Sequence, residues 1–323
     1  MNLPRVVHHI VQTPIILQGS KYKLIPFLLK NIQFPIDEAL YIEPFLGSGI
    51  VFLNMKPKTA LLSDTNPHII RFFKDLQEET YDWKEWRFTL TKAKHQLSNF
   101  ASSGKTLTYN KKTRDVSVAE EYFYQKRREF NTNPNSLDFL FLNRACFNNI
   151  MRFNQKGEFN TSFKFDKSRG LMNIKDPEGK YIDLVMEEIQ YTTNFLYNKD
   201  YTFKCQDFRE SLKACSPQNF VYLDPPYFLR DTQYFNSFSK EENNELIQFL
   251  NEQECNFAYS NWFQDQTQVN PFIQDLQNVS CHKFAHNYIV GNAQRETQQP
   301  VIECLLVSES CQRTQKLGIE KWI

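Results

Sequence analysis

The chain has 323 residues, of which 41% are hydrophobic and 23% charged, enough to form a large core in one or two domains. Its apolar runs are far shorter than a membrane-spanning helix and its N-terminus lacks the features of a secretion signal, so we expect neither membrane insertion nor export. The net charge of +1 does not by itself indicate a polyanionic partner. The seven cysteines form an odd set without a CxxC pair, which is typical of reduced thiols in the cytoplasm.

Seven short apolar runs predict β-strands, two of them early in the chain and five late. They span residues 40–45, 59–64, 201–206, 219–224, 256–261, 281–286 and 301–307. Amphipathic helices are expected between them, including one that starts with a capping box formed by Ser239 and Glu242. This alternation predicts an α/β fold with a doubly wound, Rossmann-like sheet.

The long stretch between the two groups of strands has helical periodicity. We predict that residues 68–175 form an inserted, mostly helical module, so that the sheet domain comprises residues 1–67 and 176–323. Between Lys105 and Gly170 the chain carries 13 Lys or Arg against 7 Asp or Glu. A charge run is often only a solvated surface, but aromatic and amide residues are interleaved here, as contacts to phosphates and base edges require.

Ligands of a doubly wound sheet bind beyond the carboxyl ends of its strands. Gly47 and Gly49 follow the first strand and would let the backbone approach a ligand closely. They belong to no complete GxGxxG motif, and no Walker lysine follows them, which disfavours a nucleoside triphosphate. Asp64 ends the second strand, where it could accept hydrogen bonds from ribose hydroxyls or cap the next helix. Asp207 and Phe208 follow the third strand, a pair suited to an adenine ring.

The fourth strand is followed by Asp224, Pro225, Pro226 and Tyr227. This DPPY sequence brings an acceptor carboxylate, a backbone carbonyl beside a rigid proline and an aromatic face into one small volume. Such a volume can bind a planar amine. An isolated Asp-Pro-Pro is also a common turn, so the interpretation depends on the other segments.

Together these segments resemble the adenine-N6 DNA methyltransferases of the Dam type, which use S-adenosylmethionine. GSKYKL (Gly19 to Leu24) is similar to the GGK segment of that family, YIEPFLGSG to its cofactor loop, LLSDTN to its ribose-binding strand and QDF to its adenine-contacting stretch. NRACFNNIMRFNQKGEFN resembles the target-recognition signature of the family, and DPPY is similar to its catalytic motif. The resemblance implies transfer of a methyl group to adenine N6 in double-stranded DNA, with the target base flipped out of the helix.

The resemblance also implies roles for particular residues. The catalytic residues would be Asp224, Pro225, Pro226 and Tyr227. The cofactor would be bound by Leu17, Lys21, Phe45, Gly47, Gly49, Asp64, Asp207, Phe208 and Asp224. The DNA would be contacted by Lys111, Lys112, Lys126, Arg144, Asn148, Arg152, Asn154, Lys156 and Asn160. Residues 68–175 would form the target-recognition domain, and the rest of the chain the catalytic domain.

Some positions depart from the family pattern: Leu17 replaces an aromatic residue, and Ser20 and Asn149 replace glycines. We therefore do not transfer the common GATC target of the family to this chain. The expected chemistry requires no metal, because the sulfonium charge of the cofactor already activates its methyl group. The expected partner is double-stranded DNA, with a separate endonuclease if the protein is half of a restriction pair. We expect a monomer or weak dimer. We expect it in the cytoplasm, near the nucleoid of a prokaryote.

Two other kinds of function stay open from the sequence. One is methylation of RNA adenine or of cytosine N4 in DNA, since related pockets accept other planar amines. The position of the insert, between the cofactor loop and DPPY, favours the DNA adenine arrangement. The other is a catalytically idle DNA-binding homologue, against which the intact DPPY, Asp64 and glycine loop argue.

Overall fold

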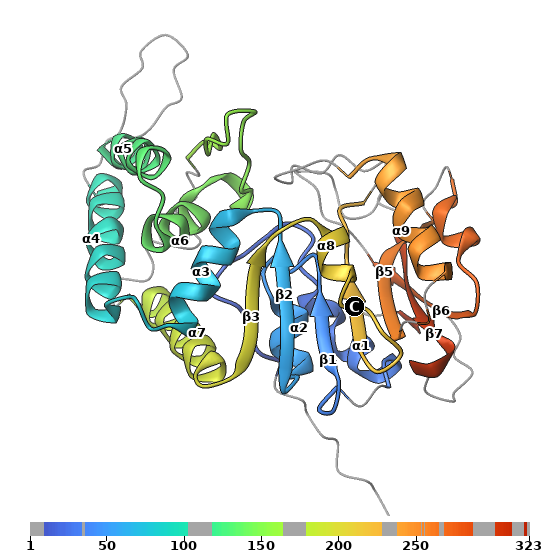
Figure 1. The fold of residues 1–323 in the computed structure, drawn as a ribbon. Coiled ribbons are helices and arrows are strands. Elements are labelled where there is room, and N and C mark those ends of the chain that lie inside the picture. The colour runs from blue at the N-terminus through green and yellow to red at the C-terminus, as the bar shows by residue number, and fades with distance from the viewer. Residues whose placement is uncertain are drawn as a thin grey trace, which may run out of the picture.

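The protein folds around one eight-stranded sheet with helices on both faces (Figure 1). The computed structural model describes residues 10–33, 36–102, 118–163, 179–227, 238–252, 254, 256–264, 268–286, 301–311 and 320–321. Its strands are β1 (Leu40–Glu43), β2 (Thr59–Asp64), β3 (Asp200–Cys205), β4 (Phe220–Leu223), β5 (Asn256–Gln264), β6 (Val279–His286), β7 (Val301–Ser308) and β8 (Glu320–Lys321). The seven strands expected from the sequence are all present.

The order of the strands in the sheet is β3-β2-β1-β4-β5-β7-β6-β8. The first five strands in this order run parallel, whereas β7 is antiparallel to both β5 and β6, and β8 pairs in parallel with β6. The chain order reverses between β1 and β4. In open α/β sheets such a switch point leaves a crevice in which ligands bind.

Helices cover both faces of the sheet because successive strand residues point to opposite sides. On one face Tyr41 packs in a core with α1 (Ile25–Asn31), α2 (Ile50–Met55), α3 (Pro67–Gln77) and α7 (Lys180–Leu196). On the other face its neighbour Ile42 packs in a core with α8 (Phe208–Leu212) and α9 (Lys240–Glu252). The predicted doubly wound α/β fold is therefore confirmed.

Helix α9 begins as its sequence predicts. The Ser239 backbone N–H donates to Glu242 Oε2 (2.8 Å), and the Glu242 N–H donates to Ser239 Oγ (3.1 Å). This reciprocal capping box satisfies two N–H groups that the helix itself cannot pair. Leu246, Ile247 and Leu250 are buried and attach the helix to the sheet.

The segment between β2 and β3 is mostly helical. It contains α3, α4 (Trp83–Ser102), α5 (Val118–Thr132), α6 (Ser136–Ala145) and α7. Helices α4 to α6 lie together beyond the edge of the sheet that β3 forms (Figure 1). Phe73 of α3 stacks on Phe203 of β3 (ring centroids 5.5 Å apart), and the adjacent Phe72 contacts Phe139 of α6 (6.1 Å). One hydrophobic core thus runs from the sheet into the helical segment, while the division into two domains at residues 68 and 175 stays a prediction.

The cysteines depart in part from the expectation. Cys215 is disulfide-bonded, so the prediction of reduced thiols is wrong for this residue. Among the described residues, Cys146, Cys205, Cys281, Cys304 and Cys311 form no disulfide. Within the same part of the chain, no helix has both the length and the apolar character needed to cross a membrane.

Candidate active site

The DPPY motif lies at the switch point of the sheet, directly after β4. The ammonium Nζ of Lys21 is 2.8 Å from Asp224 Oδ1 and 5.0 Å from the ring centroid of Tyr227. The Tyr227 hydroxyl donates a hydrogen bond to Glu303 Oε2 of β7 (3.2 Å). Three segments far apart in the sequence thus meet at the motif: the chain before α1, the end of β4 and the middle of β7.

The environment of Asp224 has opposing effects on its charge. Burial raises the pKa of this carboxyl group, the nearby Lys21 ammonium lowers it, and the Glu303 carboxylate raises it; the net result is a pKa above the ordinary value. Asp224 accepts hydrogen bonds on both oxygens only when it is ionised. Lys21 therefore favours the form of Asp224 that can bind an amine.

A second carboxylate organises the glycine loop after β1. The Gly47 backbone N–H donates to Asp64 Oδ2 (2.9 Å), and the Asn66 N–H donates to Asp64 Oδ1 (2.8 Å). Helix α3 is capped by Asn66, whose side chain accepts from the His68 N–H (3.0 Å). Of the two roles that the sequence left open for Asp64, the helix cap is wrong. Asp64 connects β2 to the glycine loop instead.

The two glycines of this loop have different roles. Both lie in the left-handed region, with φ of +50° for Gly47 and +70° for Gly49. A Cβ atom on Gly49 would lie 2.7 Å from the ring of Phe73, so Gly49 is needed for close packing of α2 against α3. Gly47 lines the pocket in front of the loop, but Gly49 does not. Gly49 thus has a packing role, and its contact with the cofactor stays a prediction.

This pocket extends along the carboxyl ends of the parallel strands and contains eight of the nine residues expected to bind the cofactor. They are Leu17, Lys21, Phe45, Gly47, Asp64, Asp207, Phe208 and Asp224. Phe45, Phe208 and Phe238 form an aromatic wall, with ring centroids 5.6 Å apart in each pair. Among the described residues, no group of three or more potential metal ligands comes together.

Sequence reasoning missed three residues of this site. Glu43 at the end of β1 lines the pocket and accepts a hydrogen bond from the Tyr41 hydroxyl (2.5 Å). Burial raises the pKa of Glu43 well above its ordinary value. Phe238 lines the pocket just before α9, and Glu303 is buried in β7. A charged residue inside each of two apolar runs, YIEPF and VIECLLV, was the signal that could have identified both glutamates.

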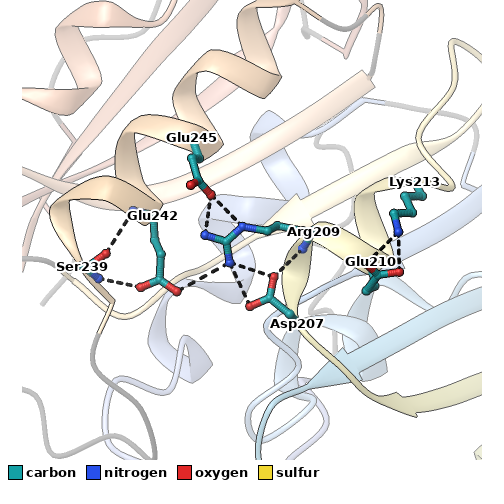
Figure 2. A network of polar contacts seen from close by, with 7 residues as sticks. All are labelled: Asp207, Arg209, Glu210, Lys213, Ser239, Glu242 and Glu245. Atoms are coloured by element: carbon teal, nitrogen blue, oxygen red, sulfur yellow. Dashed lines mark hydrogen bonds and ion pairs between the residues drawn. The ribbon is translucent and has the colours of Figure 1, made fainter.

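An ion-pair network joins α8 to the start of α9 beside the pocket (Figure 2). Asp207 caps α8 by accepting from the Arg209 N–H (2.9 Å), and it also pairs with the Arg209 guanidinium (3.1 Å). The guanidinium reaches Glu245 (2.6 Å from Nε) and Glu242 (3.8 Å) on α9. Asp207 and Glu242 both line the pocket, so Arg209 connects two of its lining residues.

Residues 18–290 match the sequence model of the family described as D12 class N6 adenine-specific DNA methyltransferase. The chain belongs to this family. It is 30% identical to the DNA adenine methylase of Haemophilus influenzae over 213 residues, which are 65% of this chain and 61% of that relative. It is 26% identical to the modification methylase StsI of Streptococcus sanguinis over 302 residues, 86% of this chain and 40% of that protein.

A third relative is the type II methyltransferase M.MjaIII of Methanocaldococcus jannaschii, 26% identical over 70% of this chain and 73% of that protein. The chain thus spans less than two thirds of the Haemophilus and Streptococcus relatives that it matches. The membership confirms the family resemblance seen in the sequence.

The segment that resembles the target-recognition signature forms a hairpin-like loop in this D12 class protein. It begins in the last turn of α6 and includes η2 (Phe147–Asn149), and beyond η2 Phe153 forms an antiparallel bridge with Phe159. Asn154 caps the tip, where its Oδ1 accepts from the Lys156 N–H (2.9 Å) and the Glu158 N–H (3.0 Å). Asn154 thus has a structural role within the loop.

The expectation that Arg144 contacts DNA is wrong for the conformation seen here. Its side chain is only 4% exposed and pairs with Glu188 of α7 (2.7 Å). Its guanidinium also donates to the Pro14 carbonyl (3.0 Å from Nε) and to the Tyr181 hydroxyl (3.1 Å). Arg144 fastens the recognition segment to the N-terminal segment and to α7, because a buried guanidinium must be paired.

The other predicted DNA contacts differ in how accessible they are. Asn148, Arg152 and Lys156 are exposed, and Arg152 Nε donates to Asn160 Oδ1 (2.8 Å). Lys126 is about one-fifth exposed (21%) and pairs with Glu129 (2.9 Å) and Asp138 (3.1 Å), so part of its charge is neutralised within the helical segment. Lys111 and Lys112 lie outside the described residues.

Proposed function

We propose that the protein transfers the methyl group of S-adenosylmethionine to N6 of adenine in double-stranded DNA. The observation that carries the proposal is the position of Asp224, which lines the same pocket as Asp64, Asp207 and Phe208. A methyl donor bound in this pocket and an amine bound at DPPY would share one wall. Direct transfer between two bound groups needs this proximity.

The residues of the pocket fit S-adenosylmethionine by charge and shape. The cofactor carries a sulfonium, an ammonium and a carboxylate, and the pocket is lined by the carboxyl groups of Asp64 and Asp224 and by the ammonium of Lys21. The cofactor also has an adenine ring, which suits the aromatic wall of Phe45, Phe208 and Phe238. When bound, the cofactor supplies an electrophilic methyl group.

The chain itself would activate the target amine. Adenine N6 is a poor nucleophile because its lone pair is delocalised into the ring. Hydrogen bonds from its N–H groups to the Asp224 carboxylate and the Pro225 carbonyl would favour a more tetrahedral nitrogen. An amine that had accepted the methyl group would carry one extra proton, for which Asp224 is an adjacent acceptor. Tyr227 would stack on the base.

The recognition segment supports duplex DNA as the substrate. A base paired inside a duplex cannot reach DPPY and must be flipped out, which leaves a gap in the helix. Phe147 is an exposed aromatic (50%) in the turn η2, and both Asn148 and Asn149 beside it have left-handed backbones. We propose that Phe147 fills this gap, as apolar side chains inserted between bases do elsewhere, while Arg152 and Lys156 contact the flanking DNA.

The relatives suggest two biological settings, and we propose that the protein acts either alone or as the modification half of a restriction pair, where a separate endonuclease would share its target. Its active form would be a monomer or weak dimer.

The test of the function is incubation of the purified protein with tritiated S-adenosylmethionine and plasmid DNA. Single-molecule sequencing then identifies the modified base and its context. We expect N6-methyladenine in one short sequence context. Label in cytosine, label found only in an RNA added in parallel, or no label with any nucleic acid would each overturn the proposal.

A further inference from the structure

Glu303 is a buried carboxylate that the chemistry described above does not use. It lies in the middle of β7, is 1% exposed and is paired in register with Trp262 of β5 and Phe284 of β6. Burying a carboxylate is unfavourable unless hydrogen bonds replace the lost water. The hydrogen-bond partners of Glu303 therefore indicate its role.

One partner is the hydroxyl of Tyr227, which donates to Glu303 Oε2 (3.2 Å). Tyr227 is half-buried and directly follows the prolines of the DPPY motif. The Lys21 ammonium lies over its ring, 5.0 Å from the centroid. The hydroxyl of Tyr227 is thus hydrogen-bonded to the sheet, while one face of its ring is turned toward the Lys21 ammonium.

A tyrosine side chain has two rotatable bonds, and stacking on a flipped base requires both to be fixed. A hydrogen bond from the phenol to an acceptor held in the sheet restricts them at the end farthest from the backbone. Because β7 is paired with β5 on one side and β6 on the other, the backbone of Glu303 is held from both sides.

We propose that Glu303 is a positioning residue that fixes the ring plane of Tyr227 for stacking on the target adenine. This inference rests on the proposed adenine methylation. It requires that, at a pH where Asp224 is ionised in every variant, Glu303 acts through Tyr227, so loss of either end of the hydrogen bond has the same effect. It also requires that the effect falls on the methyl-transfer rate and on base stacking, with cofactor affinity unchanged.

The test compares the full-length wild type with Glu303→Leu, Glu303→Gln, Tyr227→Phe and the double variant Glu303→Leu/Tyr227→Phe. Glu309→Gln, an exposed glutamate just after β7, is the matched control for loss of a carboxylate. Three quantities are measured: the single-turnover rate of methylation, the S-adenosylmethionine affinity by calorimetry, and the fluorescence of 2-aminopurine placed at the target adenine of a duplex.

We expect Glu303→Leu and Tyr227→Phe each to slow single-turnover methylation about tenfold, with cofactor affinity within about twofold of wild type. The double variant should be no slower than the slower single variant, because both changes remove the same hydrogen bond. Glu303→Gln retains an acceptor oxygen and should recover most of the rate. The 2-aminopurine should be more fluorescent in the two slow variants, since a loosely stacked base is quenched less.

Normal methylation by Tyr227→Phe, or losses that multiply in the double variant, would overturn the proposal and leave Glu303 with a purely structural role. If Glu303→Leu does not fold, Tyr227→Phe and Glu303→Gln still distinguish the positioning role from the structural one. The wild type on the same DNA separates the two hypotheses: a wild type that methylates no DNA refutes the proposed function. A wild type that methylates DNA, beside equally active Tyr227→Phe, refutes this inference alone.

Discussion

Lys21 Nζ lies 2.8 Å from Asp224 Oδ1, so the segment before α1 supplies a cation to the carboxylate at the end of β4. Lys21 is buried, with 5% of its side chain exposed. Desolvation makes a buried ion pair of this kind costly to form, and removing one partner leaves the other charge buried without compensation. The site should therefore respond strongly to a change at either residue.

The first prediction concerns catalysis by Asp224. Replacing Asp224 with Ala removes an acceptor that acts mainly on the reacting amine, and turnover should fall by roughly two or more orders of magnitude. DNA affinity should change little, since the change leaves the recognition loop intact. Single-turnover assays and DNA titrations on the same preparation measure both quantities. Near-normal methylation would refute the mechanism.

The second prediction concerns pH. Asp224 must be ionised to act as an acceptor, and its pKa is raised by burial and by Glu303 while Lys21 lowers it. Activity should therefore be lost as the pH falls through this raised pKa, at a higher pH than for an ordinary aspartate. Lys21→Met should move this acid limb to higher pH, and Glu303→Gln should move it to lower pH.

The pH–rate profiles of the three proteins, measured with saturating cofactor, check these directions. Among the described residues, Glu43, Tyr222 and Tyr259 also interact electrostatically with Asp224. They are present in all three proteins and cannot produce opposite shifts. If both variants shift in the same direction, the acid limb belongs to another group.

The third prediction concerns Asp64. Asp64→Ala should weaken S-adenosylmethionine binding by about 1.5–3 kcal/mol, the usual contribution of a charge-assisted hydrogen bond, and should loosen the glycine loop that Asp64 holds. Asn135→Ala is a suitable control because Asn135 caps α6 by accepting from the Asp138 N–H (2.8 Å). It should lower stability by about 1 kcal/mol without affecting the cofactor. Calorimetry that finds equal cofactor affinity in Asp64→Ala and wild type would remove Asp64 from the cofactor site.

The fourth prediction separates base reading from charge attraction on one loop. Arg152 and Lys156 are both exposed on the recognition hairpin, and Arg152 is oriented by Asn160 whereas Lys156 lies near its tip. Arg152→Ala should cost about 1–3 kcal/mol of binding at the cognate site and relax specificity. Lys156→Ala should weaken binding to every duplex alike and reduce the salt slope by about one. If Arg152→Ala lowers the affinity for cognate and scrambled duplexes equally, the hairpin binds DNA by charge alone and does not read bases.

The fifth prediction concerns the buried Arg144. Removing it leaves Glu188 inside the protein without its cation, and breaking a buried pair in this way costs about 3–5 kcal/mol. Burial already raises the pKa of Glu188, and Arg144 lowers it. Arg144→Ala should therefore lower the melting temperature strongly, whereas Arg128→Ala, an exposed arginine on α5, should leave it almost unchanged. A stable Arg144→Ala variant with altered sequence preference would instead show that Arg144 takes part in base recognition.

The sequence by itself determined the strands, the doubly wound fold and the residues that follow each strand. Alternation of apolar and polar residues has a period set by the backbone, and the capping box at Ser239 lies within one helical turn, so both are local patterns. Parallel strands end at one edge of the sheet, and this rule alone brings Asp64, Asp207 and Asp224 to one pocket.

Only the tertiary structure decided which charged groups meet. Arg144 is an arginine in a basic segment, and nothing near it in the chain shows that it is buried against Glu188 and Pro14. Lys21 reaches Asp224, and Glu303 reaches Tyr227, across long stretches of the chain. Local patterns fix the backbone and the side of each element that is buried, but the pairing of distant charges depends on how the elements pack, because a carboxylate or guanidinium is stable inside only where its partner is also placed.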